Sequence, residues 1–180
     1  MRLEAERSVL VVIDIQEKLV PAVEQPDALI ARVRMLLEAA AVLEIPVVFT
    51  EQYPKGLGPT VAALRESIGP EGAISKVTFA CTGEPAFARR LAALGRDQVI
   101  VCGMETHVCV LQTALGLREE GQRVAVVADA VSSRSPNDRR LGLKRMRSHG
   151  VDVVTAEMVL FEWLERAGTP AFKRLSALIK

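Results

Sequence analysis

The chain has 180 residues, 49% of them hydrophobic, and a formal net charge of +1 from 23 basic and 22 acidic residues. This length suits one domain, so residues 1–180 are expected to form a single domain with a buried core. The near-neutral charge predicts no nucleic-acid or anionic-membrane partner, and no apolar run reaches the roughly 20 residues of a membrane span. The first residues lack an apolar targeting segment, and the three cysteines form no CxxC pair, so a reducing cytoplasm is expected.

Short β-branched runs alternate with longer amphipathic stretches along the chain. The expected strands are Val9–Ile15, Pro46–Thr50, Ala73–Val77, Gln98–Cys102, Arg123–Ala128 and Val151–Thr155. The expected helices are Asp27–Glu44, Glu84–Leu94, Thr106–Glu120, Asn137–His149, Ala156–Arg166 and Pro170–Ile179, with an irregular segment at Glu51–Thr60. Apolar runs without alternation are typical of parallel strands buried on both faces. The pattern predicts a three-layer, doubly wound, Rossmann-like α/β fold with a six-stranded parallel sheet.

Ligands of open parallel sheets bind beyond the carboxyl ends of the strands, so reactive side chains there are candidates for a site. Asp14 ends the first run, Lys76 the third, and Cys109 follows the fourth. If Thr106 caps the next helix, Cys109 lies in its first turn, where free amides and the helix dipole favour a thiolate. A buried, inert cysteine is the ordinary alternative.

Asp14 and Lys76 also have ordinary interpretations, as a turn-capping aspartate and a solvated lysine. Together with Cys109 they suggest more, because a carboxylate can accept the thiol proton while an ammonium keeps that carboxylate ionised. Two strand spacings separate Lys76 from Asp14, roughly 10 Å, so Lys76 would have to lean across that gap. His107 lies two residues from Cys109 and does not face it on a helix, which disfavours a Cys-His pair.

Three blocks of sequence carry these residues, and a fourth follows them. They are 12–16 (Val-Ile-Asp-Ile-Gln), 75–79 (Ser-Lys-Val-Thr-Phe), 101–110 (Val-Cys-Gly-Met-Glu-Thr-His-Val-Cys-Val) and 126–134 (Val-Val-Ala-Asp-Ala-Val-Ser-Ser-Arg). Their order and spacing resemble the signature blocks of the isochorismatase-like cysteine hydrolase superfamily, and the resemblance extends over nearly the whole chain. Among its members, the chain looks most similar to the small YcaC-related hydrolases.

The resemblance implies a catalytic triad of Asp14, Lys76 and Cys109. It also implies a cis peptide at Met104–Glu105 and an oxyanion hole formed by the backbone amides of Glu105 and Cys109. Cys109 would attack a carbonyl carbon while Asp14 accepts its proton, and water would then release the acyl group from a thioester-type intermediate. An amide-type or related C–N bond of a small molecule is the expected substrate.

Two departures narrow the reaction further. Nicotinamidases of this fold carry histidine metal ligands after the second strand, whereas residues 51–60 contain no histidine, so neither a metal nor another cofactor is expected. Isochorismatases that cleave a vinyl ether generally lack the cysteine, so the presence of Cys109 argues against that reaction. Gln52, Tyr53 and Phe79 are the candidate substrate-binding residues, with ordinary loop packing as the alternative.

Two rival hypotheses remain at this stage. One is an inactive relative that acts as a small-molecule binding or scaffold protein, and the other is a redox sensor that uses Cys102 and Cys109. A homo-oligomer is also expected, because such small hydrolases commonly self-associate. The apolar C-terminal segments around Phe161, Trp163 and Phe172 favour core or interface packing.

Overall fold

The computed structural model describes residues 2–179 and contains one six-stranded parallel sheet. The strands are β1 (Ser8–Ile13), β2 (Val47–Gln52), β3 (Ile74–Lys76), β4 (Gln98–Met104), β5 (Arg123–Ser132) and β6 (Asp152–Val154). Their order in the sheet is β3-β2-β1-β4-β5-β6, and every pairing is parallel. The predicted fold class and all six predicted strands are confirmed.

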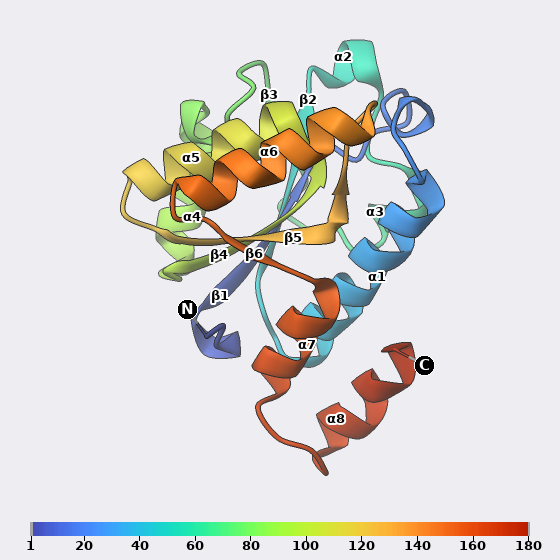
Figure 1. The fold of residues 1–180 in the computed structure, drawn as a ribbon, viewed down its shortest axis with the longest axis vertical. Helices are drawn as coiled ribbons and strands as arrows, with labels where there is room; N and C mark the ends of the chain where they lie inside the picture. The colour runs from blue at the N-terminus through green and yellow to red at the C-terminus, as the bar shows by residue number, and fades with distance from the viewer. Residues whose placement is uncertain (1, 180) are drawn as a thin grey trace.

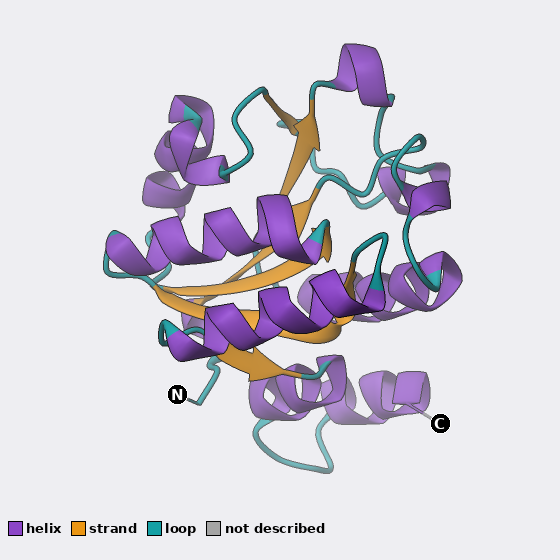
Figure 2. Ribbon diagram, turned by 45° about the horizontal axis from the view of Figure 1, so that its top comes forward, coloured by secondary structure: helices purple, strands orange, loops and turns teal. Residues whose placement is uncertain are grey.

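Helices cover both faces of this sheet (Figures 1 and 2). One face carries α1 (Pro26–Val42), α7 (Ala156–Leu164) and α8 (Pro170–Leu175), and the other carries α4 (Pro85–Leu94), α5 (Leu111–Glu119) and α6 (Pro136–Ser148). The chain moves outward from β1 through α1 to β2, and it returns across the sheet through α4, α5 and α6. Because such crossovers are right-handed, reversing the direction of travel places the helices on opposite faces.

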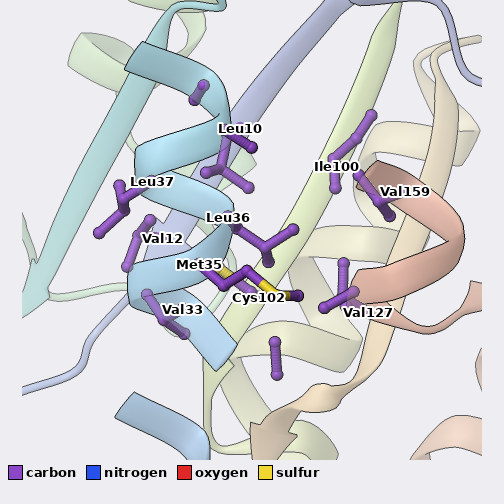
Figure 3. Close-up of a cluster of buried hydrophobic side chains, with 14 of the residues drawn as sticks. Leu10, Val12, Val33, Met35, Leu36, Leu37, Ile100, Cys102, Val127 and Val159 are labelled. Carbon is purple, nitrogen blue, oxygen red and sulfur yellow. The ribbon is translucent and has the colours of Figure 1, made fainter. Parts of the chain in front are cut away.

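The core consists of two apolar layers separated by the sheet. Alternate residues of β1 point to opposite faces, with Leu10 and Val12 in the layer under α1 and Val9 and Val11 in the layer under α5. Figure 3 shows the layer under α1, in which Leu36 of α1 faces the sheet. Every residue of β1 and β4 is buried, which explains their continuous apolar sequence.

The structure differs most from the predicted boundaries at the end of β5 and in the segment after β2. β5 extends to Ser132, past the expected end at Ala128, because the pairing with β4 shifts register between Val101 and Gly103. The segment expected to be irregular begins with the last residues of β2 and then forms a short helix, α2 (Pro54–Leu57). A second short helix, α3 (Ala62–Arg65), follows it, and neither helix was predicted.

The reversal of strand order falls between β1 and β4, whose carboxyl ends therefore diverge into different connections. This is where open α/β sheets leave a crevice for ligands. Gly103 is required there, because a Cβ atom on it would lie 2.1 Å from the carbonyl oxygen of Ile13. Within residues 2–179 no helix is long and apolar enough to cross a bilayer.

Candidate active site

Asp14 is held rigidly just after β1. Its backbone has a left-handed φ of 52°, its amide donates to the Thr50 carbonyl at 3.1 Å, and its side chain is fully buried. The carboxylate accepts two hydrogen bonds, one from the Thr50 hydroxyl to Oδ1 at 2.7 Å and one from Lys76 Nζ to Oδ2 at 2.8 Å. Both oxygens of the candidate base are therefore anchored.

Lys76 spans the two strand spacings between β3 and β1 and reaches Asp14 directly. Its ammonium has four acceptors, which are Asp14 Oδ2, Gln52 Oε1 at 2.6 Å and the carbonyl oxygens of Thr78 and Phe79 at 3.2 and 3.1 Å. Burial lowers the Lys76 pKa, but the negative charge of Asp14 raises it, and the net shift is upward. The ammonium has only three hydrogens, so none is left over for a substrate.

Cys109 lies on a π-helical turn, Thr106–Val110, that leads into α5. The predicted cap was wrong, since Glu105 is the N-cap residue and Thr106 begins the helix without capping it, which puts Cys109 one position further along. Thr106 is fully buried and its hydroxyl has no partner, so it cannot cap a helix end.

The expected stabilisation of a Cys109 thiolate was also wrong. Burial raises the pKa of the thiol to about 12, the negative charge of Asp14 adds to that increase, and Lys76 opposes it. Cys109 is 7% exposed, and this burial is the largest cause of the raised pKa of its thiol. Cys109 is therefore a neutral thiol at rest, and an attack by its sulfur would need a base to take the proton.

The segment between β4 and Cys109 is fixed by contacts with its neighbours. The Met104–Glu105 peptide is cis, as expected. The Glu105 carboxylate accepts a hydrogen bond from Arg134 Nε at 2.8 Å. Gly142 lets α6 approach the turn, because a Cβ atom there would lie 3.1 Å from the Thr106 carbonyl oxygen.

The three residues expected to bind substrate have different surroundings. The Gln52 side chain is buried and already hydrogen-bonded within the protein. It accepts a hydrogen bond from Lys76 and donates one to the Val77 carbonyl at 2.9 Å. Tyr53 and Phe79 are 55% and 54% exposed at the carboxyl ends of β2 and β3, next to Lys76. These two remain candidates for contact with a substrate, whereas Gln52 contacts Lys76.

Two contacts of the site were missed from the sequence. Thr50 bonds Asp14, and the Cys81 thiol lies 3.8 Å from the Thr50 hydroxyl. Thr50 and Gln52 are alternate residues of one strand and so share a face, which is the signal that could have identified Thr50. Burial raises the pKa of Cys81 to about 11, so this second thiol is also neutral.

The remaining cysteine does not belong to the site. Cys102 packs in the layer under α1, as Figure 3 shows, whereas Cys109 lies in the layer on the opposite face of the sheet. All three cysteines are free thiols. The separation of Cys102 from Cys109 by the sheet disfavours the redox-sensor hypothesis.

The histidines and a separate hollow lie outside this group. His107 Nδ1 is 3.0 Å from the Ser133 hydroxyl, and His149 Nδ1 is 2.9 Å from the Arg145 carbonyl oxygen. A hollow of about 290 Å³ beside the start of α1 and the end of β5 is lined by none of Asp14, Lys76 and Cys109. Within residues 2–179 no three His, Cys, Asp or Glu side chains gather in a way that could hold a metal ion.

Comparison with known proteins identifies relatives of this chain. The isochorismatase domain model matches residues 8–158. Isochorismatase domain-containing protein 2 of Danio rerio is 41% identical over 99% of this chain and 89% of its own length. The MAR1 ribonuclease structure from Caenorhabditis elegans is 39% identical, with a TM-score of 0.92 over 99% of this chain and 92% of that one. YcaC of Escherichia coli, described as an octameric hydrolase of unknown specificity, is 26% identical, with a TM-score of 0.93 over 99% of this chain and 90% of that one.

Proposed function

Because the chain belongs to the isochorismatase family, we propose that it is a cysteine hydrolase that cleaves an amide-type C–N bond of a small molecule. Cys109 is the nucleophile, Asp14 the general base and Lys76 the group that keeps Asp14 ionised. The observation that carries this proposal is the fully buried ion pair of Lys76 and Asp14, whose charges both act on the Cys109 thiol. A buried pair of this kind is expensive to maintain, which favours a functional role.

The first half of the reaction forms an acyl-enzyme. The Cys109 sulfur attacks the carbonyl carbon while its proton passes to Asp14, and the backbone amides of Glu105 and Cys109 bind the oxyanion. Asp14 then gives the proton to the leaving nitrogen, and the C–N bond breaks. Lys76 stays paired with Asp14 throughout, because its hydrogens are already used.

The second half releases the product. Water attacks the thioester carbon as Asp14 accepts one of its protons, and the sulfur leaves with the bonding electrons. Asp14 returns that proton to the Cys109 sulfur, which restores the neutral thiol. Between residues 2 and 179 no three His, Cys, Asp or Glu side chains gather in a way that could hold a metal ion, and each proposed step uses groups of the protein alone.

A panel of small primary amides, with ammonia release as the readout, tests this proposal. Activity should survive exhaustive chelation, and Cys109→Ala should abolish it. Mass spectrometry of the acid-quenched enzyme should show an acyl adduct on Cys109. An unreactive Cys109 with no turnover of any amide would favour the inactive, ligand-binding alternative.

RNA cleavage is a second candidate function, because the MAR1 relative is described as a ribonuclease. The favouring observation is a local concentration of charge that the overall balance conceals. Residues 134–147 carry six basic side chains and one acidic one. Of these, Arg140, Lys144 and Arg147 are exposed along α6 at positions i, i+4 and i+7, a spacing that places them on one face.

Binding of labelled single-stranded RNA at increasing salt tests the RNA-binding step of this second function, and gel analysis of the same RNA after incubation tests cleavage. A phosphate-binding face should lose affinity when Arg140, Lys144 and Arg147 are changed to glutamine, and the salt dependence should become shallower. Changing Arg32, Arg65 and Arg174, which lie in ion pairs elsewhere, is the matched control. Equal binding by both variants would exclude α6 as the RNA surface.

A further inference from the structure

Strand β2 lies between β1 and β3, and its side chains contact both Asp14 and Lys76. Thr50 and Gln52 are alternate residues near its carboxyl end, and both side chains are buried. Thr50 bonds Asp14, which directly follows β1, and Gln52 bonds Lys76 at the end of β3. The gap between β1 and β3 is thus filled by two hydrogen-bonding side chains.

The direction of the Thr50 hydrogen bond follows from the inventory of hydrogens. An ionised carboxylate can only accept, so the single hydroxyl hydrogen of Thr50 must point at Asp14 Oδ1. The lone pairs of the same hydroxyl oxygen face the Cys81 thiol, which has a hydrogen to donate. The hydroxyl is therefore oriented from both sides.

Two anchors on different oxygens fix the plane of the Asp14 carboxylate. Lys76 holds Oδ2 and Thr50 holds Oδ1, so the group cannot turn about its terminal bond without breaking a contact. With Lys76 alone, the carboxylate could pivot about that single contact and move its remaining lone pairs away from Cys109.

We propose that Thr50 is a positioning residue, which sets the carboxylate plane that receives the Cys109 proton. This inference rests on the proposed role of Asp14 as the base. A misplacement of about 1 Å can slow a reaction by up to about 100-fold. Loss of one neutral donor also makes a carboxylate a somewhat better proton acceptor, an opposing effect of roughly fivefold. A net loss of about 10- to 30-fold is expected.

The experiment measures alkylation of Cys109 in the folded protein, so it needs no natural substrate. In the reaction with iodoacetamide the sulfur–carbon bond forms, iodide leaves with the carbon–iodine electrons, and the thiol proton passes to Asp14. Rates are compared at pH 7 for wild type, Thr50→Val, Thr50→Ser and Asp14→Asn. Thermal melting confirms that each variant is folded, and Thr50→Ala replaces Thr50→Val if the valine variant does not fold.

Thr60→Val is the matched control. Thr60 is also buried and also donates its hydroxyl hydrogen to a carboxylate at 2.7 Å, but that carboxylate belongs to Glu51, outside the triad. It should melt at a lower temperature and alkylate at the wild-type rate.

The expected result is slow alkylation of Thr50→Val, recovery to within about threefold of wild type in Thr50→Ser, and no change in Thr60→Val. A rate within threefold of wild type for Thr50→Val would overturn the inference, and so would equal slowing in the serine variant. If Asp14→Asn also alkylates at the wild-type rate, the base assignment itself is wrong, and that outcome separates failure of the proposed function from failure of this inference.

Discussion

Replacing Asp14 by asparagine tests how the Cys109 proton is removed. The thiol pKa of about 12 means that only about one molecule in 10⁵ carries a free thiolate at pH 7. If iodoacetamide reacted with that thiolate alone, the rate would rise tenfold for each pH unit between 6 and 9. If Asp14 takes the proton during attack, the wild-type rate should be nearly flat over the same range.

Asp14→Asn removes the base and also one cause of the raised thiol pKa. A positioned general base contributes about 10²- to 10⁴-fold, whereas burial, the largest cause of the shift, is unchanged in the variant. We therefore expect alkylation at pH 7 to fall by at least about 100-fold and to regain a tenfold rise for each pH unit. The variant should approach the wild-type rate only in strongly alkaline solution.

The assay follows modification of each cysteine by peptide mass spectrometry. Trypsin leaves Cys102 and Cys109 on one peptide, residues 97–118, so fragment ions must assign the adduct, while Cys81 lies on a separate peptide. Cys109 should be modified first, since Cys81 and Cys102 are fully buried. A wild-type rate that rises tenfold per pH unit, or an Asp14→Asn variant at least as fast at pH 6 to 7, would refute the assignment of Asp14 as base.

Three further predictions concern stability and assembly. Lys76→Met leaves the Asp14 carboxylate buried without its cation and should lower the free energy of unfolding in urea by about 3–5 kcal/mol. The Lys76→Met/Asp14→Asn double variant removes both charges of the pair and should recover part of that loss. A loss below about 1 kcal/mol in Lys76→Met would contradict the buried ion pair. Because the thiol pKa values of Cys81 and Cys109 are raised, the unfolded chain loses these protons above pH 9 while the folded chain keeps them. The free energy of unfolding should therefore fall above pH 9 by roughly 1.4 kcal/mol per pH unit for each thiol. Urea midpoints between pH 8 and 10.5 measure this fall, and an unchanged midpoint would contradict the two shifts. Light scattering should give a mass above 19.6 kDa, because Met158 and Phe161 of α7 stay exposed although Trp163 is buried, and a mass that stays at 19.6 kDa on concentration would count against an oligomer.

The sequence predicts the fold well because its signals are local. Continuous apolar runs such as that of β1 fit only strands buried on both faces, and Thr169 with Pro170 begins α8 as a cap followed by a first-turn proline. The boundary at β5 was missed, because a register shift depends on pairing with β4 and leaves no pattern in β5 itself. The helices α2 and α3 have only four residues each, too few to show periodicity.

The site was harder to predict, because its properties depend on contacts between strands. The position of Asp14 and Lys76 at strand ends follows from the sequence, but their direct contact depends on how far the lysine reaches across β2. The sequence suggested a thiolate at Cys109 from its place near a helix start. Burial reversed that prediction, since desolvation depends on the packing of several segments together.

A neutral thiol at Cys109, in place of the expected thiolate, changes what Asp14 has to do. An exposed thiolate would need no base for attack, and Asp14 would then hinder it by adding a negative charge. A buried neutral thiol carries little free thiolate, which is the form that oxidants attack. In the proposed mechanism Asp14 acts in both half-reactions, first on the thiol and then on water, so its orientation matters as much as its charge. The two anchors from Lys76 and Thr50 meet that requirement, since Lys76 keeps the carboxylate ionised and both contacts together fix its plane.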